Sequence, residues 1–100
     1  MATDDSVVSE WSLYVIKCGD GKLYTGITND VEQRFSQHES GDGAKFTRGR
    51  GPLELVFRQA VGTRSRACKL EWRVKRLKRK DKERLVAGVL GLDGLLEEVN

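Results

Sequence analysis

"KLYTGITNDVEQRFSQH", residues 22–38, has the pattern of a strand, a tight break and the first turns of a helix. The alternating, β-branched run over residues 23–27 predicts a strand. Asn29 or Asp30 is suited to cap the N-terminus of a helix over about residues 31–40. A strand that feeds directly into a short helix is the local unit from which the rest of the fold can be built.

The buried side of this expected helix carries two polar residues. At about 100° per residue, Val31 and Phe35 mark the inward side, and Arg34 and His38 fall within about 60° of Val31. Burying a guanidinium group without a partner is costly. Either Arg34 meets a carboxylate inside the fold, or this helix borders an open cleft in which an anion binds.

The remaining segments predict a small α+β domain. We expect a β-hairpin from the runs 11–18 and 23–27, and a third strand over 53–61. Two helices follow, one from Thr63 or Ser65 to about Lys80 and one from Asp81 to about Leu90. The order ββαβαα predicts a mainly antiparallel three-stranded sheet flanked by helices. The expected organisation is a flexible N-terminus (1–10), one domain (11–90) and a loosely held C-terminal tail (91–100).

Charge is distributed unevenly along the 100 residues. Residues 44–84 contain 15 Lys and Arg against 4 Asp and Glu, a net charge of +11, whereas the whole chain carries +3. Such a basic half indicates a polyanionic partner, and nucleic acid is the usual one. No apolar run approaches the roughly 20 residues that span a membrane, and the acidic N-terminus lacks a signal-peptide layout. We therefore expect a cytoplasmic protein without a membrane partner, with Cys18 and Cys68 as reduced thiols.

The expected helix 65–80 has one apolar and one basic stripe. The apolar stripe predicts a core contact; its residues are Ala67, Leu70, Val74 and Leu77. The basic stripe recurs at spacings of 3 and 4 and consists of Arg66, Lys69, Arg73, Arg76 and Lys80. This stripe is either a solvated helix face or a surface that contacts phosphates. The glycine-rich loop 40–51 adds Lys45, Arg48 and Arg50 to the candidate nucleic-acid contacts.

Four further residues could carry chemistry, and each also has a structural interpretation. Tyr14 and Tyr24 lie on adjacent strands, where tyrosines are commonly half-buried packing residues. A single histidine such as His38 is usually structural. Glu71 has Lys75 four residues later, the favourable order for a helical ion pair. The inward position of Arg34 is harder to explain by packing alone.

Together these positions resemble a known pattern. The stretch "LYVIKC…GKLYTGITNDVEQRFSQH" is similar to the GIY-YIG nuclease domain, with "LYV" at the first signature and "YTG" at the second. The loop "GAKFTR" and the run "LEWRVKRLKRKDKERLV" resemble small, stand-alone, single-domain bacterial members of that family. The likeness covers about residues 12–87. The first signature lacks a glycine, and no residue matches the asparagine that many of these nucleases carry late in the domain.

The resemblance implies a metal-dependent endonuclease that hydrolyses DNA phosphodiester bonds, with repair or recombination intermediates as expected substrates. It implies Glu71 as the ligand of one Mg²⁺ or Mn²⁺ ion, Arg34 as the phosphate-binding residue and Tyr24 as general base. Tyr14 would orient water or share the proton, and His38 would position the base or the water. An ordinary tyrosine pKa of about 10 requires nearby positive charge for this role. Two alternatives stay open: a nucleic-acid-binding module without turnover, and an RNA-processing or regulatory partner.

Overall fold

The computed structural model describes residues 10–97 and contains a three-stranded sheet. Its strands are β1 (Trp11–Lys17), β2 (Leu23–Thr28) and β3 (Glu54–Gly62), in the order β2-β1-β3, and both neighbouring pairs are antiparallel. The predicted α+β class is therefore confirmed. The expected flexible N-terminus lies, except for Glu10, outside the described residues.

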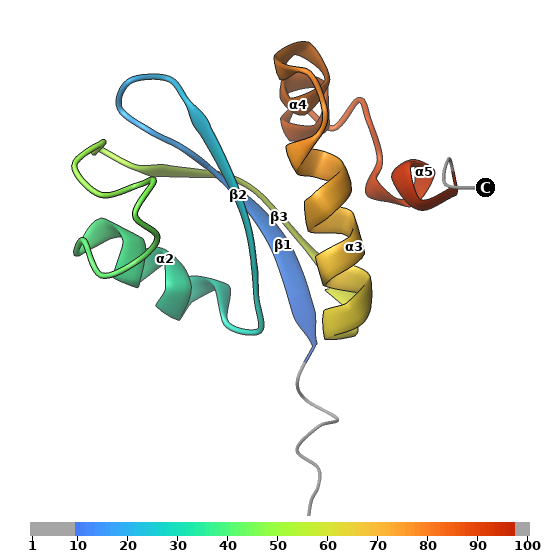
Figure 1. Cartoon of the computed structure of the whole chain (residues 1–100), viewed down its shortest axis with the longest axis horizontal. Coiled ribbons are helices and arrows are strands. Elements are labelled where there is room, and N and C mark those ends of the chain that lie inside the picture. Colours follow the sequence, from blue (N-terminus) through green and yellow to red (C-terminus); the bar gives the residue numbers. More distant parts are fainter. Residues whose placement is uncertain (1–9, 98–100) are drawn as a thin grey trace, which may run out of the picture.

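Helices cover both faces of this sheet (Figure 1). Helix α2 (Val31–Glu39) lies on one side, and α3 (Arg64–Lys75), α4 (Arg79–Val86) and α5 (Leu92–Glu97) lie on the other. The central strand β1 is consequently buried on both faces. Within the described part of the chain, no helix is long and apolar enough to cross a membrane.

The alternation of β1 separates the core from the side that faces α2. Leu13 and Val15 belong to the main apolar cluster, together with Leu70 and Val74 of α3. Because successive strand residues point to opposite faces, Tyr14 is directed to the other side of the sheet, where it meets α2. The apolar pattern that builds the core therefore also places this phenol against α2.

The start of α2 follows the expected capping. The carboxylate of Asp30 accepts a hydrogen bond from the Gln33 backbone N–H at 3.1 Å, which satisfies one of the free donors of the first turn. Val31 and His38 are buried, whereas Glu32 and Glu39 are exposed. The predicted inward side of this helix is confirmed for these residues.

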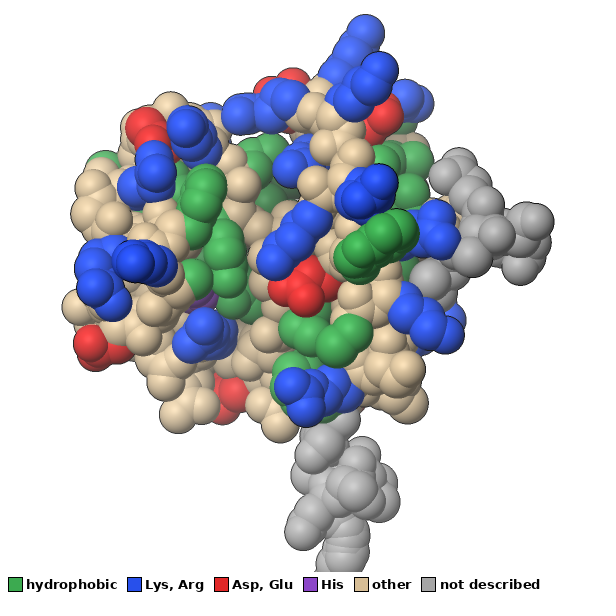
Figure 2. Space-filling model, viewed as in Figure 1, with side chains coloured by type: hydrophobic (Ala, Val, Ile, Leu, Met, Phe, Trp, Pro, Cys, Tyr) green, Lys and Arg blue, Asp and Glu red, His purple; other side chains and the backbone are tan. Residues whose placement is uncertain are grey.

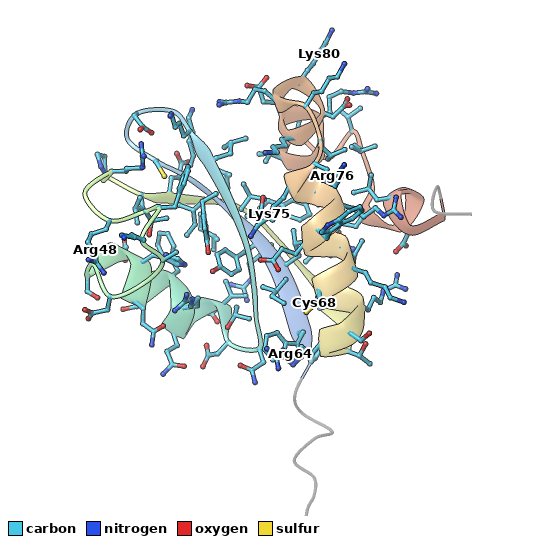
Figure 3. All side chains as sticks on the ribbon, in the orientation of Figure 1. Arg48, Arg64, Cys68, Lys75, Arg76 and Lys80 are labelled. Carbon is cyan, nitrogen blue, oxygen red and sulfur yellow. The ribbon has the colours of Figure 1, made fainter. Side chains whose placement is uncertain are left out.

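The prediction of one helix from residue 65 to Lys80 is wrong. Helix α3 ends at Lys75, Lys78 is extended, and α4 begins at Arg79. The turn between them redirects the chain so that Leu85 of α4, which is 1% exposed, reaches the core cluster. Lys80 therefore does not continue the basic stripe of α3; it lies in the first turn of α4 (Figure 3).

The second helix was expected to reach Leu90, but α4 ends at Val86. Gly88 has φ +84°, a conformation that glycine adopts without a Cβ penalty. Its N–H donates to the Leu85 carbonyl at 3.1 Å, and the Val89 N–H donates to the Arg84 carbonyl at 2.9 Å. These two bonds form a Schellman motif, which terminates the helix.

The expectation of a loosely held tail from residue 91 is also wrong for residues 92–97. This segment forms α5, and its Leu92 and Leu95 are 1% and 3% exposed within the core cluster. The leucine spacing of three places both side chains on one face of the helix. The folded unit therefore extends past the expected boundary at residue 90.

Candidate active site

Tyr14 occupies its position because the opposite strand has a glycine. Tyr14 pairs with Gly26 across β1 and β2, and a Cβ at Gly26 would lie 2.5 Å from the Tyr14 hydroxyl oxygen. Any other residue at position 26 would displace the phenol. The tyrosine of the "LYV" motif thus needs the glycine of the "YTG" motif, because a side chain at position 26 would occupy the space of the phenol.

His38 reaches the same point from α2. Its Nε2 lies 2.9 Å from the Tyr14 hydroxyl oxygen, and its Nδ1 lies 2.9 Å from Thr47 Oγ1. A Cβ at Gly43 would overlap the imidazole ring, so this second glycine is needed where the chain passes His38. His38 is only 1% exposed, and both of its ring nitrogens have hydrogen-bond partners inside the fold.

Polar groups surround both nitrogens of the His38 ring. The Ala44 backbone N–H lies 3.3 Å from Nδ1, and Thr47 Oγ1, which donates to the Ala44 carbonyl, lies 2.9 Å from the same nitrogen. Burial, and next the positive charge of Arg34, lower the pKa of His38, so the ring is neutral at pH 7.

The two tyrosines differ in their surroundings. Burial raises the pKa of Tyr14 to about 12, with a further contribution from Tyr24, whereas Arg34 acts in the opposite direction. Tyr24 is only half-buried, and its hydroxyl forms no hydrogen bond to the residues that the structure describes. Its ring centroid lies 5.2 Å from that of His38 and 6.3 Å from that of Tyr14. Tyr24 is therefore the phenol that is free to meet a ligand.

Arg34 has no acidic partner within residues 10–97. Its Nη1 donates to the side-chain oxygen of Gln37 at 3.0 Å, which is a neutral contact within α2. Its charge nevertheless affects the pKa of both Tyr14 and His38, which places the guanidinium beside them. The internal carboxylate that one interpretation of Arg34 required is therefore not found among residues 10–97.

Glu71 approaches from α3, on the side of the edge strand β2. Its side chain is 25% exposed and accepts an ion pair from Lys75 Nζ at 3.2 Å. The negative charge of Glu71 is the smallest of the contributions to the raised pKa of Tyr14. Lys75 Nζ also lies 6.0 Å from the centroid of the Tyr24 ring, and Figure 3 shows Lys75 on the side of α3 that faces the sheet.

The five expected catalytic residues come from four elements. They are Tyr14 (β1), Tyr24 (β2), Arg34 and His38 (α2) and Glu71 (α3). No group of three or more His, Cys, Asp or Glu side chains that could hold a metal occurs among the described residues. One half-exposed carboxylate fits Mg²⁺, which retains several waters and takes further oxygens from a substrate phosphate. Lys75 is a cation already bound to this carboxylate and is itself half-exposed.

The expected nucleic-acid contacts fall into two groups. Arg50 and Arg66 are already paired with acids, at 2.5 Å to Asp20 and 2.9 Å to Asp93. The others form no ion pair within the described part of the chain and leave their charge available to phosphates; they are Lys45, Arg48, Lys69, Arg73 and Arg76. Figure 3 shows Arg48 on the loop beside α2 and Arg76 on α3, so the free cations come from both sides of the site.

Two residues that touch the site were not identified from the sequence. Thr47 is 2% exposed; it contacts His38 and donates to the Ala44 carbonyl at 3.0 Å. Gly43 admits the imidazole. The sequence shows Thr47 as a lone threonine among the basic residues of the loop. Its contact with His38 joins residues nine positions apart, and no periodic pattern indicates that contact.

This combination of two signature tyrosines, an unpaired arginine and a helical glutamate agrees with the comparison to known families. Residues 10–84 match the model of the GIY-YIG catalytic domain. The chain belongs to the GIY-YIG family. Membership of this family implies a nuclease-type activity and a nucleic-acid substrate.

Relatives of this GIY-YIG domain include small proteins of similar length. The chain is 53% identical to the UPF0213 protein YhbQ of Escherichia coli, over 92% of each chain. It is 51% identical to a UPF0213 protein of Cronobacter sakazakii, over 88% of this chain and 93% of the relative.

Two solved structures share the fold. The UPF0213 protein BH0048 of Bacillus halodurans has a TM-score of 0.52 at 46% identity, covering 78% of this chain and 83% of that protein. The protein EF2693 of E. faecalis has a TM-score of 0.56 at 38% identity, covering 79% of this chain and 84% of that protein. The GIY-YIG assignment thus rests on sequence and on structure.

Proposed function

We propose that this protein is a divalent-metal-dependent endonuclease that hydrolyses phosphodiester bonds of DNA. The observation that carries the proposal is the position of Arg34, a guanidinium without an acidic partner beside two tyrosines and a half-exposed glutamate. A substrate phosphate supplies the missing anion, and a guanidinium can bind its oxygens in bidentate fashion.

In this proposal Tyr24 takes the proton of the attacking water. Tyr14 is a poor base because burial raises its pKa to about 12, so it stays protonated and acts as a donor. The hydrogen bond of 2.9 Å between His38 Nε2 and the Tyr14 oxygen fixes the phenol in the site. Lys75, 6.0 Å from the Tyr24 ring centroid, is placed to balance the charge of a Tyr24 phenolate.

Glu71 would hold the metal, Mg²⁺ or Mn²⁺, as its one protein carboxylate. When bound, the ion supplies positive charge for the phosphate and for the leaving 3′-oxygen. To bind it, Glu71 must release Lys75; helical pairs at this spacing are worth about 0.3–0.5 kcal/mol, and this one is partly exposed. The Lys75 contact is therefore a weak barrier to metal binding.

The experiment compares the wild type with Glu71→Ala and Tyr24→Phe on plasmid and branched DNA, with Mg²⁺ or Mn²⁺ and with EDTA. We expect cutting by the wild type that depends on the metal and is lost in both variants. Lys22→Ala, an exposed change outside the site, is the control and should cut as the wild type does. Absence of cutting on every substrate, or equal cutting by both variants, would refute the proposal.

One observation favours a second candidate function. Glu71 is already neutralised by Lys75, as it would be in a nucleic-acid-binding module that performs no turnover. Salt-sensitive binding of DNA without any cutting in the same experiment would support this candidate, since phosphate contacts release counterions.

A further inference from the structure

Two exposed aromatic rings, Phe46 and Trp72, lie outside the main core cluster. Among the residues that the structure describes, three large hydrophobic side chains are exposed: Phe46 (39%), Trp72 (55%) and Val89 (65%). Phe46 stacks on Tyr24 with ring centroids 5.7 Å apart and an interplanar angle of 29°. Trp72 follows Glu71 directly in α3. A base stacked on either ring would remove its apolar face from water.

Each of these rings is paired with arginine. Arg50 Cζ lies 4.7 Å from the Phe46 ring centroid, and Arg50 is itself held by Asp20 at 2.5 Å and by the Phe46 carbonyl at 2.6 Å. On the α3 side, Arg76 Cζ and Arg73 Cζ lie 4.6 Å and 5.4 Å from the centroid of the Trp72 ring. A cation over a ring holds the ring in place and adds positive charge beside it.

The other tryptophan shows what a structural ring looks like in this fold. Trp11 also has an arginine over its ring, with Arg64 Cζ at 5.3 Å, but it is only partly exposed and packs against the main core. Trp72 lacks such packing. An arginine over the ring therefore does not by itself explain why Trp72 is exposed, because Trp11 has one too and is partly buried.

The charge around the rings identifies the class of ligand. Figure 2 shows hydrophobic side chains on two sides of this face with acidic groups between them and Lys and Arg side chains around them. Aromatic rings and arginine are also enriched in protein interfaces, but the net charge of +11 over residues 44–84 favours a polyanion. Single-stranded nucleic acid is bound by aromatic rings that stack on bases and by cations that follow the backbone. In a duplex the bases are already stacked on one another, so exposed rings gain little from it.

We propose that Phe46 and Trp72 are stacking platforms for unpaired bases on either side of the bound phosphate, and that the substrate is a single-stranded nucleic acid or a single-stranded segment of a branched one. This inference rests on the proposed function for the position of the phosphate. Arg50, Arg73 and Arg76 act here as ring partners whose charge also attracts the backbone.

The test measures binding of the full chain to a fluorescein-labelled 12-nucleotide DNA strand and to its duplex, by anisotropy in EDTA. We expect the single strand to bind more tightly than the duplex. Trp72→Ala and Phe46→Ala should each weaken single-strand binding by about 5- to 150-fold, because a stacked base contributes that much to affinity. Duplex binding should change by less than about twofold. Trp72→Phe and Phe46→Tyr keep a ring and should restore most of the affinity.

Val89→Ala is the matched control, since it truncates an exposed apolar side chain other than the two rings. An RNA strand of the same sequence shows which single-stranded polymer is preferred, and both polymers should depend on the two rings. Equal losses on single strand and duplex, or no loss on either, would overturn the inference; the second result would leave Trp72 as a surface for a protein partner.

The proposed function can fail separately from this inference. Ring-dependent binding of single strands without cleavage in Mg²⁺ or Mn²⁺ would refute the nuclease and keep the platforms. Cleavage that requires Glu71 but proceeds equally on duplex DNA in the wild type and in Trp72→Ala would refute the platforms and keep the nuclease.

Discussion

The Tyr14 hydroxyl oxygen lies 2.9 Å from His38 Nε2, and this bond joins the central strand to α2 beneath the candidate site. Both side chains are 1% exposed. A glycine borders each of them, so the pair is enclosed by backbone that cannot carry a side chain. Substitutions at either glycine, and changes of pH, should therefore act on the pair directly.

Gly26→Ala should destabilise the fold and abolish activity. The new Cβ would overlap the Tyr14 hydroxyl, and relieving an overpacked core costs about 1–3 kcal/mol. Urea denaturation measures the loss. Gly91→Ala, whose Cβ would meet nothing within 4 Å, is the control and should change stability little. Unchanged stability of Gly26→Ala would contradict the close contact.

The phenol of Tyr14 should ionise only at an unusually high pH. The protein has two tyrosines, so in Tyr24→Phe the tyrosinate absorbance near 295 nm reports Tyr14 alone. Its midpoint should lie well above 10, because burial, the largest cause of the raised pKa, persists when the contribution of Tyr24 is removed. The unfolded chain releases this proton at about 10, so stability is lost as the pH rises above that value. A midpoint close to 10 in the folded variant would show that Tyr14 is not buried as described.

His38 should make the protein less stable at mildly acidic pH. Burial and the charge of Arg34 lower its pKa in the folded state below the ordinary 6.5. As the pH falls through about 6.5, the unfolded chain binds a proton that the folded chain resists, so the free energy of unfolding decreases. His38 is the one histidine, so His38→Gln should flatten this dependence between pH 7.5 and 5.5 in urea denaturation. An equally steep dependence in the variant would assign the effect to other groups.

The parts of the fold that follow local periodicity could be predicted from sequence. The alternation of β1 and β2 and the capped helix after Asp30 gave the sheet, and the inward side of α2 placed Arg34 and His38 beside the phenols. The break after Lys75 could not be predicted, because "KRLKRKDKER" contains no glycine or proline and the turn is imposed by the burial of Leu85.

The sequence predicted the site residues that belong to motifs, but not the contacts that the loop over residues 40–51 adds to the site. Glu71 and Lys75 were visible as a helical pair, but the contact of Lys75 with the Tyr24 ring depends on how α3 crosses the edge of the sheet. Thr47 is held by hydrogen bonds to the imidazole and to the loop's own backbone, which leave no periodic trace. Polar contacts of this kind, between residues far apart in the sequence, could be identified only from the structure.

Leu92→Ala tests whether α5 belongs to the core. Leu92 is 1% exposed within the apolar cluster, and truncating such a side chain costs about 2–5 kcal/mol. Val89→Ala, three residues earlier and 65% exposed, should change stability by less than about 0.5 kcal/mol. Urea denaturation of the two variants compares them directly. Equal stabilities would return residues 91–100 to the loosely held tail expected from the sequence.

Arg34→Ala should separate activity from stability. Because Arg34 forms no ion pair within the described residues, its loss should change the free energy of unfolding by less than about 0.5 kcal/mol. Loss of a donor to the charge that develops on the phosphate should lower kcat by about 10²- to 10³-fold. Arg34→Lys keeps the charge but not the bidentate geometry and should stay impaired.

The same Arg34→Ala variant has a readout that is independent of catalysis. The charge of Arg34 contributes to the lowered pKa of His38, so without it that pKa should rise towards the ordinary value and the acid destabilisation should weaken. Gln37→Ala removes the neutral partner of Arg34 and keeps its charge; it should leave the pH dependence unchanged. A large loss of stability in Arg34→Ala at neutral pH would instead reveal an internal partner for the guanidinium, and the anion-binding role would fall.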